Sequence, residues 1–167
     1  MKSNLTMLVM ILALLATPTL GRRRAVAGLS LGNLALGQYQ TKLLNAMGPP
    51  AAKSDEQTDE VTKATFERWS YPNEGLEVDI STEEGKTKSI YRIMAVAPCK
   101  LRAYRGLNIG SFEVELKAVA LQLKDDPEVA VTELPNGYRF SWEKTSQALE
   151  LTTDNGKVSK ILLGPSS

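Results

Sequence analysis

The chain has 167 residues, of which 43% are hydrophobic and 23% are charged, and its formal net charge is +1. This composition is typical of a soluble globular protein of one domain or two very small ones, and the near-zero charge gives no reason to expect nucleic acid as a partner. The chain has no histidine and one cysteine, Cys99, which argues against a Cys/His zinc site, a histidine-based catalytic triad and an intrachain disulfide. We therefore predict no catalytic residue, no metal site and no cofactor.

The N-terminal residues 1–27 are predicted to be a signal peptide. Lys2 gives a basic start, and residues 5–16 form a compact apolar segment. This segment is shorter than the roughly 20 residues that span a bilayer, and its length suits a secretory signal. Cleavage could follow Gly21 or Ala27, while an uncleaved anchor stays open because three arginines follow the apolar segment. We expect a periplasmic or secreted protein with no stable membrane span after cleavage.

The stretch 34–50 organises the first half of the mature chain. It predicts a short strand, a turn at Gly37 and an amphipathic helix that ends at Gly48, because the two following prolines cannot continue a helix. The apolar positions of this helix share one face: Tyr39, Leu43, Ala46 and Met47. We expect that face to cover a sheet.

Three strands are predicted behind this helix, after a polar and acidic loop over 51–60. Their residues are rich in β-formers or alternate between apolar and polar side chains, and Pro, Asn and Gly turn signals separate them. The three segments are 61–71, 76–80 and 86–96. The first half therefore predicts a helix followed by a three-stranded antiparallel meander.

The same layout returns in the second half of the chain, displaced by 73 residues. Three pairs illustrate the match: Trp69 with Trp142, Leu76 with Leu149, and Val78 with Leu151. A further strand candidate at 129–134 precedes Asn136-Gly137, a strong hairpin signal. We therefore predict an α+β fold of two tandem repeats, 28–98 and 99–167, each a helix packed on a three- to four-stranded antiparallel sheet.

Short glycine-centred motifs punctuate both units: Gly37 to Gly48-Pro49-Pro50, Gly75-Leu76-Glu77-Val78, Gly85-Lys86, Arg105-Gly106-Leu107, Gly110 and Gly156-Lys157-Val158. Their order resembles the SmpA/BamE-like group of small bacterial envelope domains and the tandem-repeat beta-lactamase inhibitory proteins (BLIP-like) that share their fold. The resemblance implies helical segments packed on antiparallel sheet and a protein partner in the bacterial envelope or outside the cell. This chain lacks the cysteine that follows the signal in the envelope lipoproteins, and Cys99 is alone where the inhibitors carry disulfides. The specific partners of the envelope lipoproteins and of the inhibitory proteins therefore cannot be assigned to this chain.

Four aromatic side chains are the candidate partner-binding residues: Trp69, Tyr71, Tyr138 and Trp142. Large aromatic side chains on a sheet normally belong to the core. Some of these rings could instead face outward, and an exposed aromatic row would suit recognition of a protein or peptide.

Other chemical groups have a simpler interpretation. The paired acids Glu83-Glu84 and Asp125-Asp126 lie in predicted turns and lack the ligand spacing of a calcium loop. The acidic loop over 51–60 could contact a basic partner or serve solubility alone. Cys99 could be a buried, inert thiol, or a reactive one whose pKa the nearby Lys100 and Arg102 lower.

The sequence as a whole predicts an exported, non-enzymatic protein-binding module of the bacterial envelope or exterior that binds through its sheet faces. Two alternatives stay open: a structural envelope component that self-associates weakly, and a hydrolase that uses the acidic turn residues. The identity of the partner and the oligomeric state do not follow from the sequence.

Overall fold

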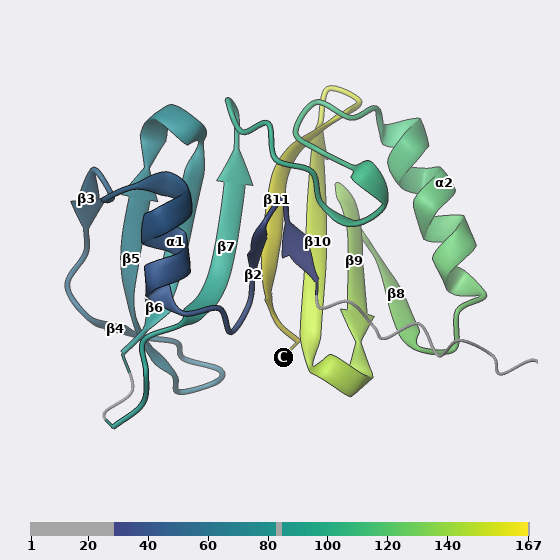
Figure 1. Ribbon diagram of the computed structural model, residues 1–167. Helices are drawn as coiled ribbons and strands as arrows, with labels where there is room; N and C mark the ends of the chain where they lie inside the picture. Colours follow the sequence, from purple (N-terminus) through teal and green to yellow (C-terminus); the bar gives the residue numbers. More distant parts are fainter. Residues whose placement is uncertain (1–28, 83–84, 167) are drawn as a thin grey trace, which may run out of the picture.

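The structure is a computed structural model that describes residues 29–82 and 85–166. The predicted signal peptide, 1–27, lies outside the described residues, as do Glu83-Glu84. A single antiparallel sheet of nine strands dominates the fold (Figure 1). In spatial order its strands are β3 (Ala52–Lys53), β5 (Thr65–Tyr71), β6 (Leu76–Ser81), β7 (Ile90–Val96), β11 (Lys157–Pro165), β10 (Gln147–Asp154), β9 (Gly137–Trp142) and β8 (Val129–Leu134), and β4 (Gln57–Thr58) also pairs with β5.

Few other regular elements are present in the described part of the chain. Two α-helices and a small two-stranded sheet lie beside the large sheet, and three short 3-10 turns connect strands or loops. These elements are α1 (Gln40–Met47), α2 (Glu113–Lys124), β1 (Ser30–Leu31), β2 (Leu34–Ala35), η1 (Pro72–Glu74), η2 (Tyr104–Gly106) and η3 (Glu143–Thr145).

The predicted fold class, two tandem helix-on-sheet repeats, is wrong. The strands of both halves form one continuous, mostly β structure, because β7 pairs with β11 through Ile93 opposite Leu163 and Ala95 opposite Ile161. A strand at the rim of a small sheet leaves a row of unpaired backbone groups, and joining the two rims satisfies both rows. The joined sheet also supports one large core in place of two thin ones.

The match between the two tryptophans does not survive in the strand register. Trp69 lies opposite Val78 in the β5–β6 pair, whereas Trp142 lies opposite Gln147 in the β9–β10 pair. At the predicted offset Val78 matches Leu151, and the residue opposite Leu151 is Tyr138. The two tryptophans therefore hold different positions in their strand pairs: Trp142 directly precedes the turn η3, whereas Trp69 lies two residues before the end of β5.

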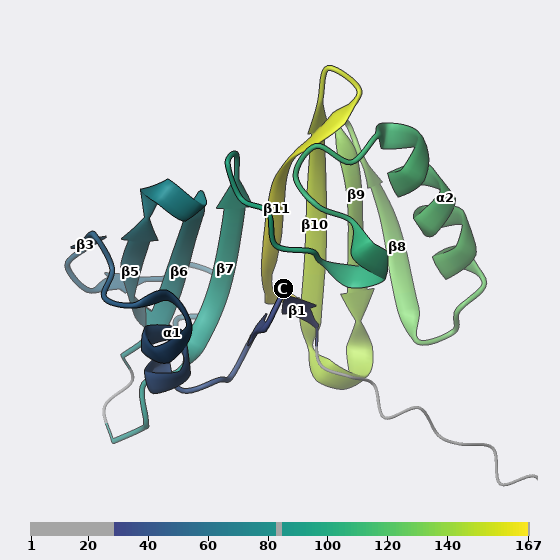
Figure 2. The same cartoon turned by 45° about the horizontal axis from the view of Figure 1, so that its top comes forward.

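Both helices and the β1–β2 pair lie on the same side of the large sheet, as the two views in Figure 1 and Figure 2 show. We call this side the covered face. Helix α1 buries Leu43 there, and α2 buries three residues of one stripe. They meet sheet residues that alternate along each strand, in one buried cluster that includes Leu43, Leu116, Ala120, Leu123, Trp69, Val78, Ile93, Leu149 and Leu163.

The predicted end of the first helix is confirmed. Gly48 has a φ of 77°, its backbone N–H donates to the carbonyl of Leu44, and the two prolines follow it. A side chain at this φ would be strained, so glycine suits the position. The turn lets the chain leave α1 and reach the sheet edge at β3.

Candidate functional site

The structure places all four candidate aromatic residues in the core. Their exposed fractions are 1% for Trp69, 3% for Tyr71, 9% for Tyr138 and 6% for Trp142. The polar atoms of two of them are satisfied internally: Trp69 Nε1 donates to Glu67 at 3.0 Å, and the Tyr71 hydroxyl donates to the Gly48 carbonyl at 3.2 Å. Burial with internal hydrogen bonds is the usual state of a core tyrosine or tryptophan.

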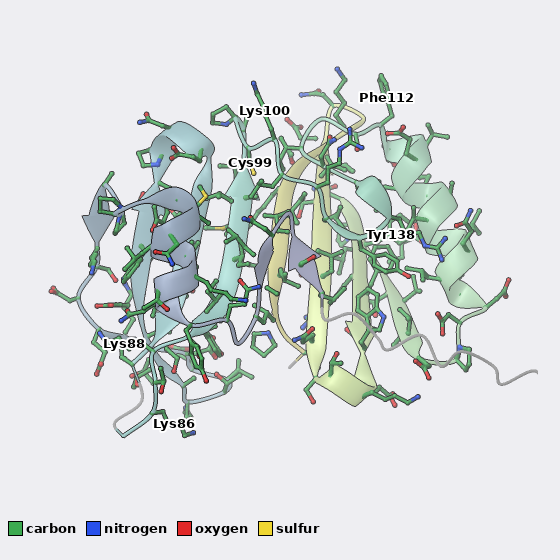
Figure 3. All side chains as sticks on the ribbon, viewed as in Figure 1. Lys86, Lys88, Cys99, Lys100, Phe112 and Tyr138 are labelled. Carbon is green, nitrogen blue, oxygen red and sulfur yellow. The ribbon has the colours of Figure 1, made fainter. Side chains whose placement is uncertain are left out.

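The rings of the second half pack against one another on the covered face. Tyr138 and Phe140 are stacked with centroids 6.3 Å apart, and Trp142 meets Phe140 edge-on at 6.4 Å. Tyr104, from η2, closes the row edge-on against Trp142 at 5.3 Å. Figure 3 shows Tyr138 on the side of the sheet that carries α2. These rings fix the helix and the η2 loop to the sheet and present no aromatic row to solvent.

The other side of the sheet, which we call the open face, carries the chemistry that the sequence interpretation missed. Successive strand residues point to opposite sides of a sheet, so the neighbours of the core residues point to the open face. Directly across three strands, Arg68 of β5 lies opposite Asp79 of β6, and Asp79 lies opposite Arg92 of β7. A row of two cations around one carboxylate therefore crosses this face.

Asp79 is a buried carboxylate, 2% exposed, and it is held from both sides. Arg68 forms a two-pronged contact, with Nε 2.7 Å from Oδ1 and the second guanidinium nitrogen 3.1 Å from Oδ2. Arg92 approaches Oδ2 at 3.7 Å. The hydrogen bond to Asp79 raises the pKa of Arg68, against the opposing effect of burial. A buried charge in this fold is thus compensated by guanidinium groups that themselves reach solvent.

A short hairpin folds over this row. Between β4 and β5, the carboxylate of Asp59 accepts hydrogen bonds from the backbone N–H groups of Val61 and Thr62 at 3.0 and 2.9 Å, and its other oxygen pairs with Arg92. The Thr62 hydroxyl hydrogen-bonds the Tyr91 hydroxyl at 2.6 Å. The hairpin therefore crosses from the edge strands to β7, and two side-chain contacts fasten its tip there.

Two aromatic rings lie beneath the guanidinium groups of the open face. Phe66 and Tyr91 are stacked with centroids 5.9 Å apart. The Arg92 guanidinium lies 5.7 Å from the Phe66 centroid and 5.2 Å from the Tyr91 centroid, and that of Arg68 lies 5.9 Å from Phe66. Such cation–π contacts orient a guanidinium without neutralising it.

Beside the hairpin tip the open face is hollowed, with a volume of about 240 Å³. Small residues of neighbouring strands leave the space: a methyl group added to Gly164 would stand 3.4 Å from the Arg92 side chain, and Ala148 lies opposite Gly164. The wall residues come from the hairpin and from β7, β9, β10 and β11: Asp59, Val61, Thr62, Arg92, Arg139, Ala148, Glu150, Leu162, Gly164 and Pro165. The hollow is the size of one or two side chains, with apolar and small groups between carboxylates and guanidiniums.

Only part of this cluster had a signal in the sequence. The alternation of Leu76, Val78 and Ile80 with acids showed that Glu77 and Asp79 point away from the core. Arg68 and Arg92 lie in the two predicted flanking strands, but the sequence did not show that both stand directly opposite Asp79, because that depends on the register.

The remaining predicted groups have structural roles. Asp126 accepts a hydrogen bond from the backbone N–H of Glu128 at 2.9 Å, as a turn residue does. Cys99 is 5% exposed, and burial raises the pKa of its thiol, although Lys100 follows it in the chain (Figure 3). Within 29–82 and 85–166, His, Cys, Asp and Glu residues form no group of three or more that could hold a metal ion.

No family model, no curated protein and no solved structure matches this chain. Over the same described residues, none of the helices combines the length and the apolar character that crossing a membrane requires.

Acid is expected to release the hairpin tip. The Thr62 amide, the Arg92 guanidinium and the Val61 amide outweigh the effect of burial and lower the pKa of Asp59 from 3.8 to about 2. A lowered carboxyl pKa adds stability above the unfolded value of 3.8, and this contribution is lost as the pH falls through about 2. The carboxyl carbon resonance of Asp59, followed by NMR, should titrate near 2, together with faster amide exchange at Val61 and Thr62.

The control for this titration is Arg92→Gln. The midpoint of Asp59 should rise in this variant but stay below the ordinary carboxyl range, since the Val61 and Thr62 amides still donate. A wild-type midpoint at or above 3.8 would show that Asp59 is not held by these groups in solution.

Proposed function

We propose that the protein is an exported, non-enzymatic binding module that recognises a protein partner through the open face of its sheet. The observation that carries the proposal is the contrast between the two faces. The covered face is filled by both helices and the aromatic row, whereas the open face carries a hollow bordered by arginines, carboxylates and half-buried apolar side chains. Arginine and partly exposed apolar groups around a pocket are the features that protein interfaces concentrate.

The dimensions of the open face support a protein as the partner. Eight strand positions at about 4.8 Å spacing make a surface roughly 34 Å wide, and six or seven residues along a strand give about 20 Å of height. The product approaches the roughly 800 Å² that each partner contributes to a standard interface. A small ligand would use only the hollow.

The side chains along one row of this face suit such contact. From β9 to β6, Arg139 lies opposite Glu150, which lies opposite Leu162, and Met94 continues the row between Leu162 and Glu77. An apolar centre flanked by charged groups resembles the core and rim of an interface. Export, expected from the N-terminal sequence, would put this face in the periplasm or outside the cell.

Binding is tested by affinity capture from a bacterial envelope extract with a matched pair of variants. Leu162→Arg places a charge at the centre of the open face, and Leu121→Arg places one on the exposed side of α2, where Leu121 is 64% exposed. We expect the wild type and Leu121→Arg to capture the same protein and Leu162→Arg to lose it by roughly tenfold or more, the scale of a disrupted interface centre.

Circular dichroism and thermal unfolding establish that both variants are folded. Equal capture by all three forms would contradict the open face as the binding surface. Selective loss with Leu121→Arg would move the interface to α2.

A further inference from the structure

The hairpin that crosses the open face lies over the cluster of arginines and carboxylates on that face. Arg92 contacts Asp59 of the hairpin and lies 3.7 Å from Asp79 of the neighbouring strand. Asp79 is already engaged by two nitrogens of Arg68. The main counter-charge of Arg92 is therefore supplied by Asp59.

The hairpin supplies the close counter-charge of Arg92. Arg68 has two carboxylates near it, Asp79 and Glu77, whereas Arg92 has Asp59 and the more distant Asp79. If Asp59 moves away, Arg92 keeps only Asp79, which Arg68 already engages, and its guanidinium borders a hollow that both Arg139 and Glu150 line. A guanidinium that loses its close carboxylate at the wall of a cavity favours an anion there.

The hairpin can move without disturbing the sheet. Strand β4 has two residues and pairs with β5 only through Gln57 and Thr58, and the residues from Glu60 to Lys63 are exposed. Asp79, in contrast, lies within β6 with strands on both sides. Opening the tip requires the loss of the Arg92 and Tyr91 contacts, while no strand of the large sheet beyond β4 has to separate.

Resting on the proposed function, we propose that Arg92 is the anchor for an acidic side chain of the protein partner, and that Asp59 holds this position until the partner displaces it. A partner aspartate or glutamate reaches Arg92 through the hollow, over Gly164 and Ala148. Guanidinium and carboxylate groups can form a planar, two-pronged contact. Asp59 pairs with Arg92 through one oxygen, because its other oxygen accepts from the Val61 and Thr62 amides, so the exchange replaces one carboxylate by another that can use both oxygens. The free hairpin then lies beside the bound partner.

The geometry explains why the partner group should be acidic and why a carboxylate side chain fits. A neutral amide would leave the half-buried Arg92 without a close carboxylate in place of Asp59, which is costly. The hollow of about 240 Å³ has room for a carboxylate side chain, and the departure of Asp59, Val61 and Thr62 from its wall enlarges it.

The test uses a defined probe and the full mature protein. The probe is the acetylated and amidated tripeptide Gly-Glu-Gly, and its control is Gly-Gln-Gly. Binding is followed by NMR through the Nε–Hε resonance of Arg92 and the amides of Val61 and Thr62. Asp59→Asn keeps the shape of the turn but removes its charge, so we expect it to bind the glutamate peptide roughly tenfold more tightly than the wild type, on the scale of one charge-assisted hydrogen bond.

Two further variants complete the design. Asp59→Glu restores a carboxylate and should return the affinity toward that of the wild type, and Asp59→Asn combined with Arg92→Gln should abolish saturable binding. Equal affinity of the wild type and Asp59→Asn, or equal binding of both peptides, would overturn the inference. If the double variant does not fold, the difference in peptide affinity between Asp59→Asn and Asp59→Glu is sufficient to test the inference.

Failure of this inference is distinguishable from failure of the proposed function. Loss of capture with Leu162→Arg, together with no peptide binding at Arg92, would leave the open face as the interface and reject only the acidic anchor.

Discussion

Replacement of Asp79 by alanine is expected to lower the free energy of unfolding by about 3 kcal/mol, the cost of leaving buried or half-buried charges without their partner. Arg68 would lose both of its contacts to this carboxylate, and Arg92 would keep only Asp59. The arginine side chains are 34% and 24% exposed, so water compensates them in part and the effect stays at the lower end for a broken buried ion pair. Urea unfolding followed by tryptophan fluorescence measures it.

The matched control for this prediction is Glu77→Ala on the same strand and the same face. Glu77 is 3.6 Å from Arg68, but its side chain is 40% exposed, and we expect a change within about 0.5 kcal/mol. If Asp79→Ala lowered the free energy of unfolding by less than about 1 kcal/mol, water would be compensating the two arginines without the Asp79 carboxylate.

Replacement of Trp142 by alanine is expected to lower the free energy of unfolding by about 4 kcal/mol. The indole is 6% exposed and lies edge-on to both Tyr104 and Phe140, so its removal leaves a cavity where η2 and β9 meet. The matched control is Leu121→Ala, an apolar side chain exposed on the outer side of α2, with an expected change within about 0.5 kcal/mol. Thermal unfolding and urea unfolding measure both variants.

This variant also separates the two interpretations of the aromatic residues. If Trp142→Ala kept the stability of the wild type but lost partner capture, the ring would belong to a binding surface after all. A loss of stability would show that Trp142 acts as a core residue, because Tyr104 and Phe140 lose the ring that they pack against.

The local elements of this fold could be predicted from the sequence where short-range rules decide them. The helix expected over Tyr39–Met47 is α1, and the strand expected at 129–134 is β8, followed by the hairpin at Asn136-Gly137. In these places a glycine turn, or apolar residues spaced with the period of a helix or a strand, decides the local structure. The strand expected over 61–71 begins only at Thr65, because Asp59 ties the preceding residues into a turn.

The fold class could not be predicted because it depends on which strands become neighbours. Alternation along 86–96 identifies a strand with one buried face, but does not specify its partner. The pairing of Ile93 with Leu163 decides between two small sheets and one large one. The cluster on the open face could not be predicted for the same reason, since Arg68, Asp79 and Arg92 come together only through the register.

The ladder between β7 and β11 has a kinetic consequence. It joins Val96 to Lys160, so the intervening chain forms a long loop whose closure costs entropy before any contact rewards it. The hairpins on either side involve near neighbours in sequence and can form earlier. We expect the middle of the sheet to be among the last parts to assemble, with the rim of β7 unpaired until the last strand arrives. A chain that is synthesised or exported N-terminus first would therefore complete its core only when its C-terminal strand, β11, has emerged.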